Sequence, residues 1–374
     1  MRLLDRYLLR ELLLPLAYCL CGFVILWTAG DLFQQMGDML QKKKLVAHEI
    51  IEYYLYSTPT ELLLILPMAL LLALLYALTN HARHNEITAI RAAGISLWRV
   101  CLPYLAVGFA ASLFLLVLNE FWLPDSADVA EQVLKRHTRA PGAPGKNRVP
   151  HLTFENSRDR RLWEMELYNV DTGEMTKPLV TWIQADGSSR WLSANRALRV
   201  RGVWQFYDVV EHLDVSKTNS LLVPGLRTNL LAMPEFSETP EQIKSEIKLA
   251  SSLNLSAIKR PDIPVKDIVN YLQLHTTMPP GAKPWLYTKL HGRLAAPFTC
   301  LVVVLIAIPF AAGSGRRNVF VGVAGSICIC FLYFILQQFG LAFGASGHLP
   351  PWLAAWFPNI TFGLTGLWLT SRVR

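Results

Sequence analysis

Six long apolar stretches separated by polar segments dominate the pattern of this chain. They cover residues 12–30, 62–79, 100–119, 294–314, 318–342 and 349–371, and no charged side chain lies in their interiors. A helix that crosses a bilayer needs roughly 20 mostly apolar residues. The pattern therefore predicts six transmembrane helices, three on each side of a long polar insert.

The insert alternates between apolar and polar positions in a way that favours short strands. Alternation is clearest over 161–170, 179–185, 191–200 and 203–213, within a region of about 150–235. Such runs between Asp/Gly turns are typical of an antiparallel sandwich or jelly roll.

Residues 140–150 are predicted to be a linker, and helices are expected from Thr239 and over 265–274. The domain is either a plain spacer or offers a groove or sheet edge to a partner.

Composition divides the chain in the same way. Residues 120–293 hold 23 basic and 20 acidic residues, whereas the other 200 residues hold only 13 and 8. The insert therefore has the charge of an ordinary soluble domain, about 25%. With 52% hydrophobic residues overall, the chain is neither disordered nor an ordinary soluble enzyme.

Basic residues in the short loops predict the orientation, because they mark the cytoplasmic side. The N-terminal segment, the loop 80–99, the turn 315–317 and the C-terminal tail carry ten arginines, and the turn 343–348 carries none. Both termini are therefore expected in the cytoplasm, with 120–293 on the opposite side. Much of the net charge of +8 reports this topology.

Catalytic and cofactor patterns are missing from the sequence. No Cys or His spacing is typical of a metal site, and no GxxxxGK[ST] phosphate loop occurs. The spans also lack the buried Asp, Glu, His or Arg that ion-coupled carriers use. We expect no bound cofactor or metal and no catalytic residue, so energy for any transport must come from a partner.

The cytoplasmic loop 81–99 is the candidate contact for such a partner. Ile87 and Ile90 share one helical face, and Gly94 is a natural helix stop, which predicts a short helix near 81–95. Glu86 is the only acid in this basic loop. It either complements a helix N-terminus and nearby arginines or docks into a groove of the partner.

The stretch from Arg83 to Ser96 resembles the signature of the lipopolysaccharide-export permeases, the LptF/LptG (YjgP/YjgQ) family. The segments Leu4–Tyr7, Pro59–Ala69, Gly292–Pro297 and Leu349–Asn359 agree with it. The resemblance covers the whole chain, and its opening residues together with Pro350-Pro351 favour the LptG-like paralogue.

The resemblance implies an α-helical inner-membrane protein of a Gram-negative-type bacterium with an inserted periplasmic jelly-roll-like domain. Its domains would be 1–119, 120–293 and 294–374. Such a permease is non-catalytic, pairs with a paralogous permease as a heterodimer, and sits on an ATPase dimer that uses ATP and Mg²⁺. It passes lipopolysaccharide to a single-span jelly-roll protein (LptC-like) and a bridge protein, and no nucleic acid is involved.

Three groups of residues would carry this function. The coupling helix would use Arg83, Glu86, Ile87, Ile90, Arg91 and Gly94. Lys42, Lys43 and Lys44 would meet substrate phosphates unless they are a solvated run, although the chain has Asp31 where LptG-type members often place a basic residue. Gly340 and Gly344 form a close-packing motif, at a gate or within the subunit.

Other classes of protein remain as alternatives to this reading. A membrane-anchored sensor would need a cytoplasmic output domain, which the short loops do not offer. An ion-coupled carrier is disfavoured by the uncharged spans, and another lipid- or lipoprotein-exporting permease would share most of these features.

Overall fold

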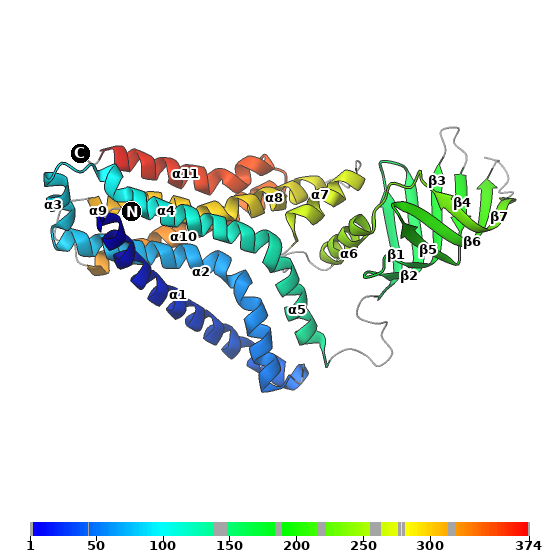
Figure 1. Ribbon diagram of the computed structural model, residues 1–374, viewed down its shortest axis with the longest axis horizontal. Coiled ribbons are helices and arrows are strands. Elements are labelled where there is room, and N and C mark those ends of the chain that lie inside the picture. The colour runs from blue at the N-terminus through cyan, green and yellow to red at the C-terminus, as the bar shows by residue number, and fades with distance from the viewer. Residues whose placement is uncertain are drawn as a thin grey trace. The chain divides into compact units, whose positions relative to one another are not determined.

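A computed structural model describes residues 3–43, 45–137, 148–183, 189–214, 222–254, 263–275, 278, 281–312 and 319–372. The chain divides into two compact units (Figure 1). The helical unit comprises Met1–Thr138 and Pro280–Arg374, and the β unit comprises Arg139–Pro279.

Long helices form the helical unit. They are α1 (Leu3–Gly37) with the π-helical η1 (Asp38–Lys42), α2 (Ala47–Arg83), α3 (Glu86–Ala92), α4 (Leu97–Val117) with the π-helical η2 (Leu118–Trp122), α5 (Leu123–Lys135), α8 (Ala282–Ala295) with the 3₁₀ turn η4 (Ala296–Phe298), α9 (Thr299–Ala312), α10 (Val319–Ala345) and α11 (Pro351–Arg372).

Five segments in the described part of the chain are long and apolar enough to cross a membrane. These are Leu3–Leu40, Ala47–Arg83, Leu97–Trp122, Ala282–Pro309 and Ile327–Ala345. The sixth predicted span forms α11, a helix of 22 residues. The prediction of a multi-pass helical protein with an inserted antiparallel β domain is confirmed.

Helix α2 is the centre of the helical unit. Its buried residues Leu70 and Leu74 join one apolar core with Tyr104 of α4 and Val304 of α9. Helices α4 and α9 approach closely, since a Cβ added at Gly108 would lie 2.7 Å from Cγ2 of Val304. Small residues permit this approach in membrane helices, where packing replaces the hydrophobic effect.

The β unit is built on one antiparallel sheet. Its strands are β1 (Arg148–Asn156), β2 (Arg161–Asn169), β3 (Met175–Ile183), β4 (Ser189–Ser193), β5 (Arg196–Val200), β6 (Val203–Asp214) and β7 (Leu222–Met233). Strands β4 and β5 both lie between β3 and β6. The prediction of one strand over 191–200 was wrong, because the chain is interrupted at Ala194 and Asn195, between β4 and β5.

The linker prediction also needs a correction at its end. Residues 148–150 pair with β2 as part of β1, so the strand begins before the predicted boundary. The rest of the linker, residues 140–147, lies outside the described residues.

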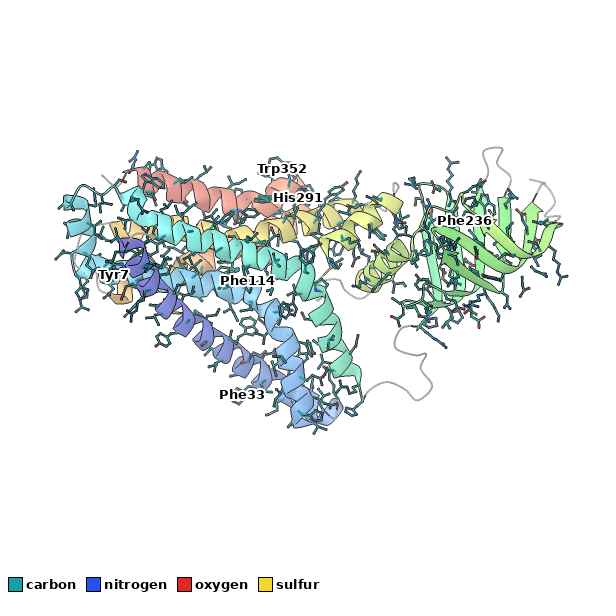
Figure 2. The ribbon with its side chains drawn as sticks, in the orientation of Figure 1. Tyr7, Phe33, Phe114, Phe236, His291 and Trp352 are labelled. Atoms are coloured by element: carbon teal, nitrogen blue, oxygen red, sulfur yellow. The ribbon has the colours of Figure 1, made fainter. Side chains whose placement is uncertain are left out.

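Aromatic side chains fill the core of the β unit. Trp163 and Trp204 are fully buried, and the ring of Phe236 meets that of Trp163 at 5.3 Å between centroids. Figure 2 labels Phe236 among the side chains of the β unit. Helix α6 (Pro240–Asn254) then begins at a capping box, in which Thr239 and Gln242 exchange side-chain and backbone hydrogen bonds. Helix α7 (Val265–Leu274) matches the predicted range.

Candidate functional site

The short helix α3 connects α2 to α4 and follows from three local signals. Asn85 before it adopts a left-handed conformation with φ 58°, which asparagine tolerates better than most residues. Gly94 after it has φ +82°, which glycine adopts without strain. Ser96 then caps α4 by accepting a hydrogen bond from the backbone amide of Arg99. These turns set α3 apart from both spans.

Glu86 is held by side chains from two other helices. The hydroxyl of Tyr7 in α1 donates a 2.8 Å hydrogen bond to Oε2 of Glu86. Nδ1 of His81 in α2 lies 2.7 Å from the same oxygen. The rings of Tyr7 and His81 also meet at 5.6 Å, so the three residues form one cluster, named here the Glu86 cluster. Figure 2 shows Tyr7 at the same end of the helical unit as α3.

The Glu86 cluster favours a charged carboxylate. Burial acts to raise the pKa of Glu86, but the hydrogen bonds from His81 and Tyr7 outweigh it and lower the pKa below its usual value. His81 itself is buried, with 1% of its side chain exposed. Glu86 keeps 32% exposure, so it is anchored inside the chain and still reachable from outside.

A second polar contact closes the same end of the helical unit. Nη2 of Arg99 at the start of α4 lies 2.9 Å from Oδ1 of Asp5 in α1. Together with the Glu86 cluster, this ion pair joins the beginnings of α1 and α4 to the loop that carries α3. Displacement of α3 would therefore also pull on α1 through these contacts.

The other predicted coupling residues divide between buried and exposed positions, with Arg83 at the end of α2 and Gly94 after the end of α3. Ile87 is buried, and Ile90 packs against the core of the helical unit. Arg83, Arg91 and Gly94 are exposed. The two isoleucines therefore hold α3 against the helical unit, whereas the exposed residues are accessible to a partner. Trp98 at the start of α4 is also 48% exposed and was not predicted.

The sequence reading also missed Tyr7 and His81 as members of the cluster. A His–Glu pair five positions apart across a loop follows no helical spacing. Tyr7 lies 79 positions away from Glu86. No signal in the local pattern could have identified either residue.

The predicted basic cluster is only partly described. Lys42 ends η1, and Lys43 follows it, with its backbone N–H bonded to the carbonyl of Asp38. Lys44 and the side chain of Lys42 lie outside the described residues. A role for these lysines in phosphate binding stays a prediction.

The glycine motif of α10 packs against α11 within the same chain. A Cβ added at Gly340 would meet the backbone oxygen of Ala354, and one added at Gly344 would lie 2.6 Å from Cβ of Ala354. Thr288 of α8 is also within 2.8 Å of the Gly344 position. Both glycines therefore serve close packing inside the helical unit.

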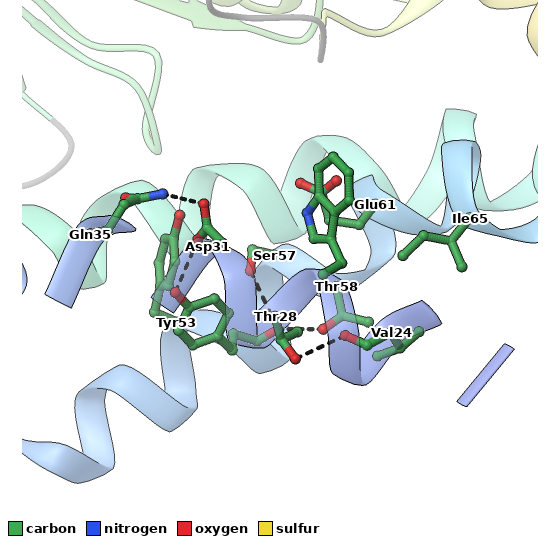
Figure 3. A pocket seen from close by; sticks show the side chains of 11 residues that line it. Val24, Thr28, Asp31, Gln35, Tyr53, Ser57, Thr58, Glu61 and Ile65 are labelled. Carbon is green, nitrogen blue, oxygen red and sulfur yellow. Dashed lines mark hydrogen bonds between the residues drawn. The ribbon is translucent and has the colours of Figure 1, made fainter. Parts of the chain in front are cut away.

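A polar cavity lies between α1 and α2 (Figure 3). It is lined by Val24, Trp27, Thr28, Asp31, Gln35, Tyr53, Tyr54, Ser57, Thr58, Glu61 and Ile65. Asp31, noted above as a departure from the family pattern, accepts hydrogen bonds here from Tyr54 and Gln35. The sequence reading did not bring these residues together.

Comparison with known proteins gives a consistent result over nearly the full chain. Residues 6–372 match the family described as "Lipopolysaccharide export system permease LptF/LptG". The chain is 24% identical to the lipopolysaccharide export system permease protein LptG of Escherichia coli, over 99% of this chain and 98% of that protein. It is also 24% identical to LptG of Haemophilus influenzae, over 85% and 84% of the two chains.

Proposed function

The chain belongs to the LptF/LptG family of lipopolysaccharide export permeases, and we therefore propose that α3 is the segment through which an ATPase transmits its movement to the permease. The chain is a permease subunit of the Lpt lipopolysaccharide export system and a multi-pass inner-membrane protein. The Lpt system pairs it with a partner permease.

The Glu86 cluster is the observation that supports this proposal. A coupling segment must contact its motor on one side and be tied to the moving helices on the other. Arg91 of α3 and Arg83 at the end of α2 are exposed, whereas Ile87 is buried. Glu86 connects to α1 through Tyr7 and to α2 through His81. A push on α3 is thereby delivered to the first two spans.

The rest of the assembly follows as part of the same proposal. The permease binds no nucleotide, and the ATPase dimer supplies the ATP and Mg²⁺ chemistry. The chain forms a heterodimer with its paralogue in the LptG-like role. Lipopolysaccharide then passes to an LptC-like jelly-roll protein and a bridge protein through the periplasmic β unit. Figure 1 shows both termini at the α3 end of the helical unit, which supports a shared cytoplasmic side.

Charge reversal at Glu86 tests the coupling. The Glu86→Lys variant should lose lipopolysaccharide export and lipid-stimulated ATP hydrolysis. The side chains of Tyr7 and His81 would lose the carboxylate that they contact and would face a cation in its place. Glu235→Lys, at an exposed acid of the β unit, is the matched control and should retain both activities. Normal export by Glu86→Lys, or purification of the chain from detergent without any ATPase, would overturn the proposal.

A further inference from the structure

The apolar segment that begins with α8 is broken before α9. Helix α8 passes into the 3₁₀ turn η4, and α9 starts at Thr299. Pro297 causes the break, because it has no N–H for the carbonyl four residues earlier, which belongs to Arg293. The amide of Thr299 bonds to the carbonyls of Ala296 and Pro297. The carbonyl of Ala295 therefore lacks its usual α-helical donor as well.

Side chains of two other helical elements supply donors to these carbonyls. Nδ2 of Asn119 in η2 donates a 3.1 Å hydrogen bond to the carbonyl of Arg293. Nδ2 of Asn359 in α11 donates a 2.8 Å hydrogen bond to the carbonyl of Ala295. Both asparagines are buried, with 5% and 6% of their surface exposed. The hydrocarbon of a bilayer offers no water, so irregular backbone is stable there only when protein groups satisfy it.

The contact at Asn119 joins two irregular turns. Element η2 is π-helical, and such turns interrupt the regular hydrogen-bond pattern and are frequent at functional sites. Nη2 of Arg293 donates a hydrogen bond back to the carbonyl of Asn119. The π-helical turn after α4 and the break before α9 are therefore held together by a reciprocal pair of hydrogen bonds.

Asn359 also connects the break to α10. The hydroxyl of Tyr333 in α10 donates a 2.7 Å hydrogen bond to Oδ1 of Asn359. The same hydroxyl lies 2.7 Å from Oγ1 of Thr299, the first residue of α9. Tyr333 is 4% exposed, so no solvent competes for these bonds. One amide thus binds the broken backbone through its nitrogen and α10 through its oxygen.

The segments before and after the break pack on different helices. Helix α8 packs on α10, where a Cβ added at Gly292 would lie 3.1 Å from Cδ2 of Leu341. Helix α9 packs on α2 and α4, where Val304 fills the space beside Gly108. A change in the angle at Pro297 would therefore move α8 with α10, relative to α9 with α2 and α4.

Helix α11 contacts both α8 and α9, and it is interrupted at the same level. Pro358 lies inside α11 directly before Asn359. This proline has no N–H for the carbonyl of Ala354, so α11 also lacks one of its regular hydrogen bonds there. The helix that contacts both segments is thus weakened beside the break and does not brace it rigidly.

We propose that Pro297 is a hinge, and that Asn119, Asn359 and Tyr333 are positioning residues that set its angle. A hinge concentrates a large backbone change in a few residues. Here the two asparagine amides keep the carbonyls bonded while the segment bends. Tyr333 links the bend to α10. The hinge rests on the ATP-driven movement proposed above and adds the place at which the permease bends.

Spin labels on the full transporter complex in nanodiscs measure the bending. One label replaces Lys283, an exposed residue of α8, and the other replaces Phe109, an exposed residue of α4, in a chain without native cysteines. ATP with vanadate should change the distance between the labels. Pro297→Ala should abolish most of this change, because alanine restores the N–H for the carbonyl of Arg293 and favours a continuous helix.

Export distinguishes a hinge from a packing irregularity. Pro297→Ala should unfold at the same temperature as the unaltered complex or higher, whereas lipopolysaccharide extracted per ATP should fall by about tenfold, the scale of one buried hydrogen bond that favours the straight form. Pro309→Ala is the matched control. It removes a proline inside α9, away from the bonded carbonyls, and should retain extraction.

A double-mutant cycle tests the role of Asn119. Asn119→Ala should shift the unfolding equilibrium by about tenfold when Pro297 is present, because a buried carbonyl loses its donor. The shift should be smaller together with Pro297→Ala, since the restored N–H then bonds to that carbonyl. Equal shifts in both backgrounds would overturn the assignment of Asn119 to the hinge.

Tyr333→Phe tests the link to α10 and leaves both carbonyls bonded. It should lower extraction per ATP, whereas Tyr76→Phe, at a position of α2 that is 46% exposed, should not. An unchanged label movement and normal extraction in Pro297→Ala would overturn the hinge. If that variant does not assemble, normal extraction by Tyr333→Phe overturns it instead. Absence of ATP-driven extraction by the unaltered complex would reject the proposed export drive rather than the hinge alone.

Discussion

The hydroxyl of Tyr7 donates a 2.8 Å hydrogen bond to Oε2 of Glu86, across 79 positions of sequence. This bond joins the first turns of α1 to α3. His81 completes the cluster from α2. The loop between α2 and α4 is therefore tied to the first long helix by a specific polar contact.

Removal of the Tyr7 hydroxyl should loosen α3. We expect Tyr7→Phe to lower the free energy of unfolding by about 1 kcal/mol, since Glu86 is partly exposed and solvent replaces part of the bond. Amide hydrogen exchange over residues 84–93 should accelerate. Tyr18→Phe is the control, because Tyr18 is also in α1 but is 76% exposed.

A double-mutant cycle isolates the bond between the two side chains. Tyr7→Phe and Glu86→Ala should be less destabilising together than the sum of the single changes, because each of them removes the same hydrogen bond. Additive effects would show that Tyr7 acts through packing rather than through Glu86.

The glycines of α10 should not tolerate a methyl group. Gly340→Ala and Gly344→Ala place Cβ against Ala354, and overpacking of this kind costs about 1–3 kcal/mol. Thermal unfolding in detergent measures the loss. Gly325→Ala in the same helix meets no atom within 4 Å, so it should be neutral or stabilising by up to about 1 kcal/mol through helix propensity. Equal midpoints for all three variants would contradict this packing.

Arg161 should be essential for the β unit. Its Nη1 lies 2.8 Å from Oε2 of Glu238, which is fully buried and also accepts a 2.7 Å hydrogen bond from Asn156. Arg161→Ala leaves this carboxylate without its cation, at a cost of about 3–5 kcal/mol. Arg227→Ala, at an exposed position of β7, should cost little in the same denaturation experiment.

Glu246 should make the packing of α6 on α7 depend on pH. Burial raises its pKa from 4.5 to about 7. Nδ1 of His275 lies 3.8 Å from Oε2 of Glu246, too far for a hydrogen bond. Burial lowers the pKa of His275, so its surroundings favour the neutral ring over the charged one beside this carboxylate.

The sign of the pH effect follows from proton binding. Between pH 4.5 and about 7, the folded chain holds a proton that the unfolded chain has released. Stability should therefore fall as pH rises through this window, by up to about 3 kcal/mol, and level off above it. Hydrogen exchange of α6 and α7 at both ends of the window measures the effect. Glu246→Gln should abolish the slope, and a slope that persists in this variant would assign it to another group.

The sequence by itself determined the long apolar helices, the approximate position of α3, which is shorter than predicted, and the presence of an antiparallel β insert. These features depend on periodicity, apolar length and capping residues such as Gly94 and Thr239, which act over a few neighbouring positions. The interruption of the strand predicted over 191–200 into β4 and β5 was missed, although the consecutive polar residues Asn195 and Arg196 break the alternation at this point.

Tertiary structure alone decided which side chains meet. The Glu86 cluster joins residues 79 positions apart, and the cavity lined by Asp31 and Glu61 joins residues of two successive helices. The partner of Gly340 was likewise undetermined, because a small-residue motif permits close approach without specifying the neighbouring helix. Local patterns encode which face of a helix is apolar, whereas the pairing of helices depends on how whole surfaces fit together.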